Sequence, residues 1–429
     1  MAMTREALHD AIQKILVERL ELPDLSPFSL GARLNGDLYL DSVHLLQVFL
    51  HLELEHQLAI PEEALAKQEL ETVDDLISLY IPKSIQPSYA LTGGEVDEGV
   101  HGDAYYDIKV HCFVSCVSDG LKKQGIDHRP LYFMLWDAKF DVSDRYKLLY
   151  HSANIVQDQH RYWFARLYQV PIDEWYDHNV SQAKNFEVLV DMLEKRAEDQ
   201  SIMVLLDMYH LPERENKFNQ NPFPHYLMLE NSDDPQNWMV RDPDYRWEGL
   251  IDISTIRNAI LQPSAGGGYV FHHSEARAAS AEDVRALFEA NFIPDSNPII
   301  NALRDIVNAH ASGRVGLRLS DLTEAVKELP VLTIRKYAYE HGFAYFWRAL
   351  NLPSDEFEQW CEEIEALIQH LKSIHYLALK LANTQSWSDL VVLNDRIDAA
   401  DAQEFKLKRK LAEVFGLWVD IRKTVSTAE

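Results

Sequence analysis

The stretch from residue 82 to residue 103, PKSIQPSYALTGGEVDEGVHGD, divides this chain of 429 residues into separate folding units. It contains two prolines, a Gly-Gly pair and an acidic tail, and its apolar residues follow neither a helical nor a strand period. Such a segment cannot bury a core, so we interpret it as a linker. The chain length and the apolar fraction of 47% suffice for two or three domains. We therefore expect a small domain over 1–81 and a larger part after the linker.

The first 81 residues have the pattern of a small helical bundle. Residues 4–20 carry apolar side chains at helical spacing, and a second helix begins near Ser42. A closing helix, TVDDLISLYI, begins at Thr72, a suitable N-cap with Asp75 three residues later. Taken alone, Ser42 is an ordinary helix-capping serine.

A buried helix with a cysteine in its first turn follows the linker. The stretch DIKVHCFVSCVSDGLKKQG, residues 107–125, has apolar side chains at three- and four-residue spacing, and Gly125 supplies the stop. Cys112 then lies where unpaired backbone N–H groups and the helix dipole favour the thiolate, which is the nucleophilic form. The alternative is that Cys112 packs as a small hydrophobe, which is common for a free cysteine.

Three short strands are expected downstream, after a helix at 181–198. They are an apolar run at 202–206, a run that begins at His225, and a run that ends at Asp242. If the last two pair antiparallel, His225 and Asp242 become neighbours. Cys112, His225 and Asp242 would then suit the roles of nucleophile, base and orienting carboxylate. Alone, the histidine is more often a core residue and Asp-Pro an ordinary turn, but their order in the chain favours function.

Charge and composition narrow the classes of partner. A formal net charge of −27 argues against nucleic-acid binding, because a phosphate backbone would be repelled. We find neither a secretory signal nor an apolar run near the roughly 20 residues that cross a bilayer, so we expect a cytoplasmic protein without a membrane partner. Three cysteines without such a signal indicate reduced thiols. No zinc spacing is present, and the pair His272-His273 lacks a third ligand, so no metal site is expected.

The first domain resembles an acyl carrier protein over its whole length. The resemblance rests on an Asp-Ser-aliphatic triplet at 41–43, later acidic residues (Glu53, Glu55), an Ile60-Pro61 step and the Thr-Val-x-Asp-Leu closing helix. It implies a four-helix bundle in which Ser42 carries covalent 4′-phosphopantetheine. It also implies two partners, a phosphopantetheinyl transferase and an acyl-loading enzyme.

The second domain, 104–275, resembles the butirosin-type acyltransferases. The resemblance rests on His111-Cys112, on Asp-x-Tyr-x-Leu-Pro at 207–212, on His225 before an apolar strand and on Val-x-Asp-Pro at 240–243. It implies a papain-like α+β fold related to the peptidases that trim bacteriocin leaders. By the same resemblance Cys112, His225 and Asp242 are catalytic, and Asp207 and Tyr209 bind substrate. Those peptidases have a glutamine six residues before the nucleophile, where this chain has Tyr106, so a second oxyanion donor is not assigned.

The remainder, 276–429, carries helical apolar periods and resembles the C-terminal part of the same family. We expect this helical domain to support the catalytic domain rather than to bind substrate. The sequence thus predicts a multidomain protein of α and α+β class, with an acyl carrier bundle, a papain-like domain and a helical C-terminal region.

The predicted function is acyl transfer in specialised-metabolite biosynthesis. An acyl group on the Ser42 phosphopantetheine would pass through an acyl-Cys112 intermediate to a small-molecule amine. Three alternatives remain open: a thioesterase, an acyl cyclase that uses the same triad, and a non-catalytic scaffold that presents the carrier. The sequence also leaves open whether a homodimer forms and whether the carrier serves its own chain or a second copy.

Overall fold

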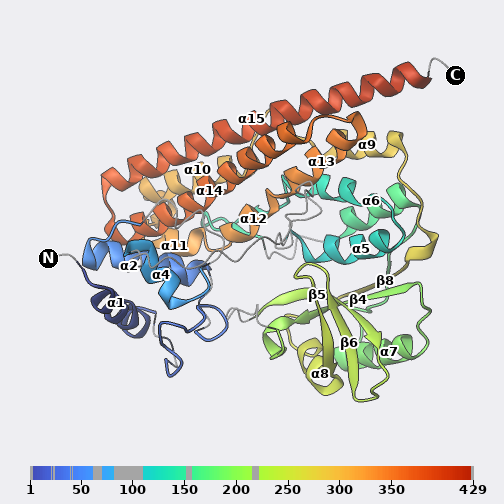
Figure 1. Ribbon diagram of the computed structural model, residues 1–429, viewed down its shortest axis with the longest axis horizontal. Coiled ribbons are helices and arrows are strands. Elements are labelled where there is room, and N and C mark those ends of the chain that lie inside the picture. Colours follow the sequence, from blue (N-terminus) through green and yellow to red (C-terminus); the bar gives the residue numbers. More distant parts are fainter. Residues whose placement is uncertain are drawn as a thin grey trace, which may run out of the picture.

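The computed structural model of the chain describes residues 3–20, 22, 25–38, 40, 42–60, 70–81, 110–150, 157–214 and 222–426. Figure 1 shows a group of N-terminal helices, a sheet flanked by helices, and a long helical C-terminal region that runs above both. The fold is therefore a mixture of helix and sheet. Within the described residues, no helix combines the length and the apolar character that a membrane span requires.

The N-terminal part contains three described helices, α1 (Arg5–Glu18), α2 (Ser42–His56) and α4 (Val73–Tyr80). Thr72 and Asp75 form the expected reciprocal capping box at the start of α4. These helices confirm the three predicted from periodicity. Residues 61–69 and the linker 82–103 lie outside the described residues, so the four-helix carrier bundle and the domain boundaries stay predictions.

Among the described residues, the large sheet has six strands in the order β3-β8-β4-β5-β6-β7, and every neighbouring pair is antiparallel. The second and third predicted apolar strands pair across a short turn as expected, with Met228 opposite Arg241. A separate two-stranded sheet joins β1 to β2. The strands are β1 (Asp141–Val142), β2 (Leu148–Leu149), β3 (Asp173–Glu174), β4 (Gln200–Asp207), β5 (Pro224–Asn231), β6 (Asn237–Asp242), β7 (Trp247–Asp252) and β8 (Gly268–His272).

Helices cover both faces of the large sheet, because successive strand residues point to opposite sides. On one face, Leu227 and Leu229 of β5 pack into a core with α7 (Gln182–Glu194) and α8 (Ile253–Ile260). On the other face, Tyr226 and Met228 join a core that includes α5 (Cys112–Lys123) and α6 (Asp158–Tyr168). Figure 1 shows α5 and α6 on one side of the strands and α7 and α8 on the other. The cysteine-bearing helix is thus fixed against the middle of the sheet.

As far as residue 426, where the described residues end, the C-terminal region contains helices and connecting loops without a strand, and two long helices, α14 and α15, run along each other (Figure 1). Its helices are α9 (Ala281–Asn291), α10 (Pro298–Ala311), α11 (Leu322–Ala325), α12 (Leu329–Arg335), α13 (Ala338–Leu350), α14 (Ser354–Thr384) and α15 (Trp387–Ser426). Short 3-10 helices are η1 (Arg129–Met134), η2 (Met208–His210), η4 (His273–Glu275), η5 (Arg314–Gly316) and η6 (Leu319–Asp321). This confirms the helical C-terminal region expected from the sequence.

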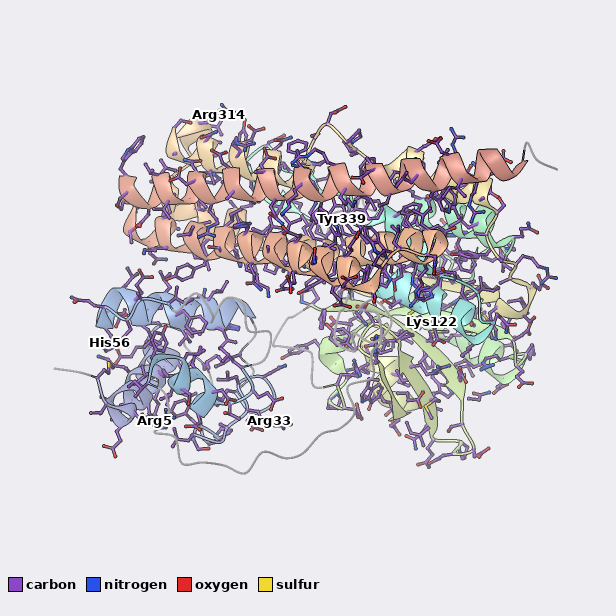
Figure 2. The ribbon with its side chains drawn as sticks, turned by 45° about the horizontal axis from the view of Figure 1, so that its top comes forward. Arg5, Arg33, His56, Lys122, Arg314 and Tyr339 are labelled. Carbon is purple, nitrogen blue, oxygen red and sulfur yellow. The ribbon has the colours of Figure 1, made fainter. Side chains whose placement is uncertain are left out.

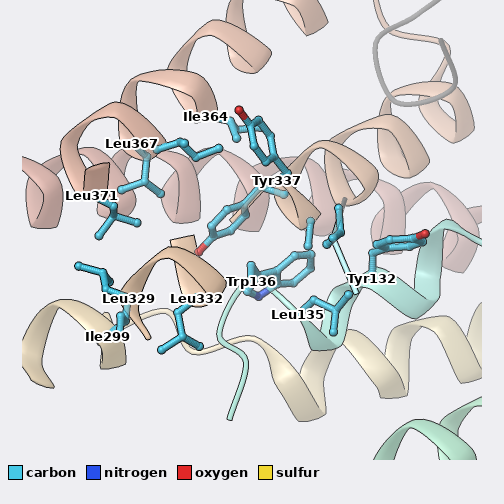
Figure 3. Close-up of a cluster of buried hydrophobic side chains, with 14 of the residues drawn as sticks. Tyr132, Leu135, Trp136, Ile299, Leu329, Leu332, Tyr337, Ile364, Leu367 and Leu371 are labelled. Carbon is cyan, nitrogen blue, oxygen red and sulfur yellow. The ribbon is translucent and has the colours of Figure 1, made fainter. Parts of the chain in front are cut away.

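Trp136, which follows η1, joins the two larger parts of the molecule through a shared core. Figure 3 shows its indole among apolar side chains from α10, α12 and α14. The ring stacks on Tyr339 with centroids 5.2 Å apart. A Cβ atom at Gly342 of α13 would lie 2.9 Å from the indole, so this mid-helix position needs glycine.

A buried network of charges crosses the same junction. Lys336 and Lys408 face Asp137 and Glu404, and the side chains of all four are at most 2% exposed. The Lys408 ammonium lies 2.8 Å from the Asp137 carboxylate, and Tyr339 donates to Glu404 at 3.0 Å. Because two positive and two negative groups compensate one another, the network ties α15 to the segment after η1 without an unpaired buried charge.

Replacing Lys336 by Met should lower the free energy of unfolding by about 3–5 kcal/mol, because Glu404 would lose its buried cation. Urea denaturation followed by tryptophan fluorescence measures the change. Lys406→Met is the matched control, since Lys406 is 46% exposed and pairs with Glu363 at the surface. The control should cost less than about 1 kcal/mol. If the two variants lost the same free energy of unfolding, the buried network would not stabilise the protein more than a surface ion pair does.

Candidate active site

Cys112 is the first residue of α5 and is half-buried. The preceding residue, His111, caps the helix: its backbone is extended, and its Nδ1 accepts from the Val114 N–H at 3.4 Å. The first-turn N–H groups and the positive end of the helix dipole thus lie beside the Cys112 sulfur.

The other two cysteines are packed as core residues. Cys116 is fully buried one turn further along α5, and its thiol lies 3.6 Å from the carbonyl oxygen of Tyr226. Burial, reinforced by the nearby charge of Cys112, raises the pKa of the Cys116 thiol well above its ordinary value. Cys361 lies in α14, where burial likewise raises its pKa. Cys112 is therefore the thiol best suited to react.

His225 and Asp242 are neighbours across the β5–β6 pair, as expected from the antiparallel pairing. The Nε2 atom of His225 lies 3.1 Å from Oδ1 of Asp242, and both residues are buried. Burial lowers the pKa of His225, but the Asp242 carboxylate and the charge of Cys112 outweigh it and raise the pKa to about 10. The structure thus places His225 in a hydrogen bond with Asp242 and in favourable electrostatic interaction with Cys112.

Arg214 holds the other side of the Asp242 carboxylate, and sequence analysis missed it. Its Nη2 atom donates to Oδ2 of Asp242 at 2.6 Å, and its guanidinium lies 4.4 Å from the ring centre of Trp247. The backbone N–H of Tyr245 donates to Oδ1 at 3.3 Å. These contacts orient Asp242 toward His225. No spacing in the sequence pointed to Arg214, because it follows β4 in a segment without periodicity.

Asp244 attaches the start of α5 to the turn after β6, and it too was missed. Its Oδ1 atom accepts from the backbone N–H of His111 at 3.2 Å and from the Ser115 hydroxyl at 2.8 Å. The carboxylate therefore fixes the position of the cysteine-bearing turn relative to the strand that carries Asp242. In the sequence, only its position two residues after Asp242 could have indicated that Asp244 belongs to the site.

Asp207 and Tyr209, predicted to bind substrate, have contacts that stabilise the loop after β4. Oδ1 of Asp207 accepts from the backbone N–H groups of Tyr209 at 3.1 Å and Phe223 at 2.9 Å, and Oδ2 accepts from the Ser264 hydroxyl at 2.6 Å. Tyr209 is half-buried, and its ring contacts His210. Their role in substrate binding stays a prediction.

Ser42 is the first residue of α2, which lies in the N-terminal helices, apart from the Cys112 site (Figure 1). Tyr106, at the position of the peptidase glutamine, lies outside the described residues. In the part of the chain that the structure describes, no group of three or more His, Cys, Asp and Glu side chains could hold a metal ion. His272 instead contacts Asp199 at 3.3 Å, and His273 contacts Ser201 at 3.2 Å.

Comparison with known proteins assigns the larger part of the chain to one family. Residues 107–276 match the DUF6005 N-terminal domain, and residues 282–429 match the DUF6005 C-terminal domain. The chain is also 38% identical over 320 residues to petrobactin synthase from Bacillus anthracis, and this match covers 74% of this chain and 98% of that protein. The chain belongs to the DUF6005 family. It is thus a homologue of a biosynthetic enzyme.

A second relative of this DUF6005 protein is a carrier. The chain is 36% identical over 85 residues to the acyl carrier protein AsbD from Bacillus anthracis, and the match covers 20% of this chain and 91% of that protein. The DUF6005 matches begin at residue 107, after the predicted linker. This chain is therefore similar both to a carrier and to a synthase, which are two separate proteins in Bacillus anthracis.

The C-terminal DUF6005 domain contacts the N-terminal one through the buried side chain of Arg335. Burial lowers the pKa of Arg335, but Tyr150, Asp244 and Cys112 outweigh it and raise the pKa. Its Nη2 donates to the Tyr150 hydroxyl at 3.1 Å, and its buried Nε has no hydrogen-bond partner. Sequence analysis expected only a supporting role for this region, and Arg335 lies on no motif that could have revealed it.

The pKa of about 10 for His225 in this DUF6005 protein predicts a pH-dependent stability. Because folding raises the pKa from 6.5, the stabilisation is complete below pH 6.5 and is lost as the pH rises towards 10. The free energy of unfolding should therefore decline over this interval, and the decline should be smaller in Asp242→Asn. Urea denaturation at several pH values measures both slopes. Parallel profiles for the two proteins would contradict the assigned ion pair.

Proposed function

We propose that this protein is an acyltransferase that moves an acyl group from a phosphopantetheine thioester to an amine through an acyl-Cys112 intermediate. The observation that carries the proposal is that Cys112, the first residue of a helix packed on the sheet, interacts electrostatically with His225, which is itself hydrogen-bonded to Asp242. The relative named petrobactin synthase supports a role in siderophore or other secondary-metabolite biosynthesis.

The proposal assigns the donor to the N-terminal helices. Residues 1–81 would be the carrier, 82–103 its linker, 104–275 a papain-like catalytic domain and 276–429 the helical domain. Similarity to AsbD supports the carrier. Ser42 as the first residue of α2 fits 4′-phosphopantetheine, because first-turn N–H groups favour a phosphate there. The bound cofactor would hold the acyl group as a thioester.

In the first half-reaction, the Cys112 thiolate attacks the thioester carbonyl carbon and forms a new carbon–sulfur bond. Backbone N–H groups at the start of α5 would donate to the oxyanion, and the positive charge of Arg335, which interacts electrostatically with Cys112, would add to its stabilisation. The bond to the donor sulfur then breaks, and the His225 imidazolium gives its proton to the departing thiolate. A His225 pKa of about 10 keeps that proton available at neutral pH.

In the second half-reaction, the amine attacks the acyl-Cys112 carbonyl carbon while neutral His225 accepts a proton from the amine nitrogen. The carbon–sulfur bond to Cys112 breaks, an amide is released, and the thiolate–imidazolium pair returns. Asp242, held by Arg214, keeps the imidazole oriented and stabilises its positive charge in both halves. Two half-reactions at one site imply ping-pong kinetics.

The test is mass spectrometry of the intact protein and its peptides. The protein would be co-expressed with a broad phosphopantetheinyl transferase and then treated with an acyl-pantetheine. The proposal expects a pantetheine mass on the Ser42 peptide, an acyl mass on the Cys112 peptide, and loss of that acyl mass when an amine is added. In the control, the acylated protein is incubated in buffer without amine, and the acyl mass on the Cys112 peptide should persist.

The outcomes separate the alternatives. Loss of the acyl mass in buffer alone would identify a thioesterase, and a cyclic product without an acceptor would identify an acyl cyclase. Pantetheine on Ser42 with no acyl group on Cys112, for several acyl donors, would contradict the transferase and favour the scaffold. The transferase needs a separate loading enzyme and a small-molecule amine as partners, and neither nucleic acid nor a membrane.

A further inference from the structure

Glu53 of α2 makes a polar contact between the N-terminal helices and the C-terminal domain. Glu53 accepts a hydrogen bond from the Lys380 ammonium at 2.6 Å and a second one from the Tyr376 hydroxyl, both on α14. Tyr376 and Lys380 are four residues apart, so they lie on the same face of that helix. A single carboxylate therefore engages two donors on one helix face.

The contact is well shielded from solvent. Tyr376 is 3% exposed, and the side chains of Glu53 and Lys380 are 22% and 21% exposed. Tyr80, at the end of α4, lies close by, since burial and the Glu53 charge both raise its pKa. The apolar core of the N-terminal helices is also continuous with that of α14. An apolar contact combined with a partly shielded ion pair is typical of a specific interface.

The orientation of α2 relates this contact to the position of the catalytic domain. Figure 2 shows His56, the last residue of α2, at the end of the molecule away from α5 and the sheet. The opposite end of α2, which begins at Ser42, therefore points toward the side where the Cys112 domain lies. A carrier held at Glu53 would present its cofactor-bearing end toward the catalytic domain, with the helix lying along α14.

We propose that the face of α14 with Tyr376 and Lys380 is the docking surface for the carrier helix α2 during acyl delivery. The occupant is the N-terminal domain of the same chain, recognised through Glu53. The C-terminal DUF6005 domain then has a direct part in donor recognition, beyond its packing against the catalytic domain. This inference rests on the proposed carrier role of the N-terminal helices.

The test is a double-mutant cycle on the full chain with Glu53→Gln, Lys380→Gln and both together. Each single change should slow single-turnover acyl transfer from the loaded Ser42 cofactor about tenfold, because the ion pair between α2 and α14 is lost and the remaining Lys380–Asp389 pair at 3.9 Å lies wholly within the C-terminal domain. The double variant should be no slower than either single one, since all three lose the same contact. Transfer from a short free acyl thioester should be unchanged in all variants.

Glu55→Gln is the matched control. Glu55 lies two residues further along α2, but it contacts Arg19 at 2.8 Å and His51 at 3.1 Å within the N-terminal helices. This change should leave transfer from the Ser42 cofactor within about twofold of the unmodified protein, as expected for a partly exposed pair.

Hydrogen exchange provides a readout that does not depend on activity. Exchange in α2 and in the α14 turn around Tyr376 should rise in the single variants and stay unchanged in Glu55→Gln. Unchanged exchange, or transfer that is unchanged or faster after loss of Glu53, would overturn the proposal; faster transfer would identify a storage contact. If the unmodified protein used no thioester at all, the proposed function would be wrong. Hydrogen exchange would still test whether α2 binds to the face of α14 with Tyr376 and Lys380.

Discussion

Replacing Cys112 by Ala should lower acyl transfer by at least about 10³-fold, the scale of loss when a catalytic nucleophile is removed. The reason is that the covalent intermediate can no longer form, while His225 and Asp242 keep their mutual contact. The measurement is initial rate of amide formation from the loaded carrier and from a short acyl thioester. Both rates should fall together, because both donors react at the same sulfur.

Cys116→Ala separates loss of the nucleophile from loss of packing. Cys116 is on the same helix, one turn later, and is fully buried. Its replacement should cost about 1 kcal/mol of stability by removing buried volume, with activity within a few-fold of normal. Pantetheine attachment to Ser42 should be intact in both variants. Full activity in Cys112→Ala would refute the assignment of Cys112 as nucleophile. Loss of activity in Cys116→Ala alone would identify Cys116 as the nucleophile instead.

Replacing Ser42 by Ala should abolish pantetheine attachment and with it all transfer from the protein's own carrier. Transfer from a short acyl thioester should continue, because the Cys112 site lies in a different part of the molecule. Intact mass and single-turnover rates measure these effects. Ser29→Ala, an exposed serine in the loop before α2, is the matched control and should retain both activities. Loss of both activities in Ser42→Ala would instead indicate a folding role for Ser42.

Mixing the two inactive variants decides how the carrier is used. An equimolar mixture of Ser42→Ala and Cys112→Ala contains one intact carrier and one intact nucleophile on different chains. Recovered transfer at low protein concentration would indicate a carrier that serves a second copy, as in a homodimer. Absence of recovery would indicate that each carrier serves its own chain, where the linker raises its effective concentration.

Several local features of this protein were predictable from sequence. The start of α5 at Cys112, the capping box at Thr72 and the strands that contain His225 and Asp242 all agree with the structure. Helical period, strand alternation and cap chemistry depend on residues within a few positions of one another. The antiparallel β5–β6 pairing was also accessible, because a short turn leaves little choice of partner.

The sequence by itself therefore determined most of the helices, the strands β4, β5 and β6 and the neighbourhood of His225 and Asp242, whereas it did not predict the strands β1, β2, β3 and β7. Only the tertiary structure decided what surrounds them: Arg214 against Asp242, Asp244 against His111, Arg335 from the C-terminal domain, and Glu53 on α14. Apart from Arg214, these side chains meet partners more than a hundred residues away, where no local period or cap restricts the choice. Such contacts follow from how whole elements pack, which burial of apolar surface drives without regard to distance along the chain.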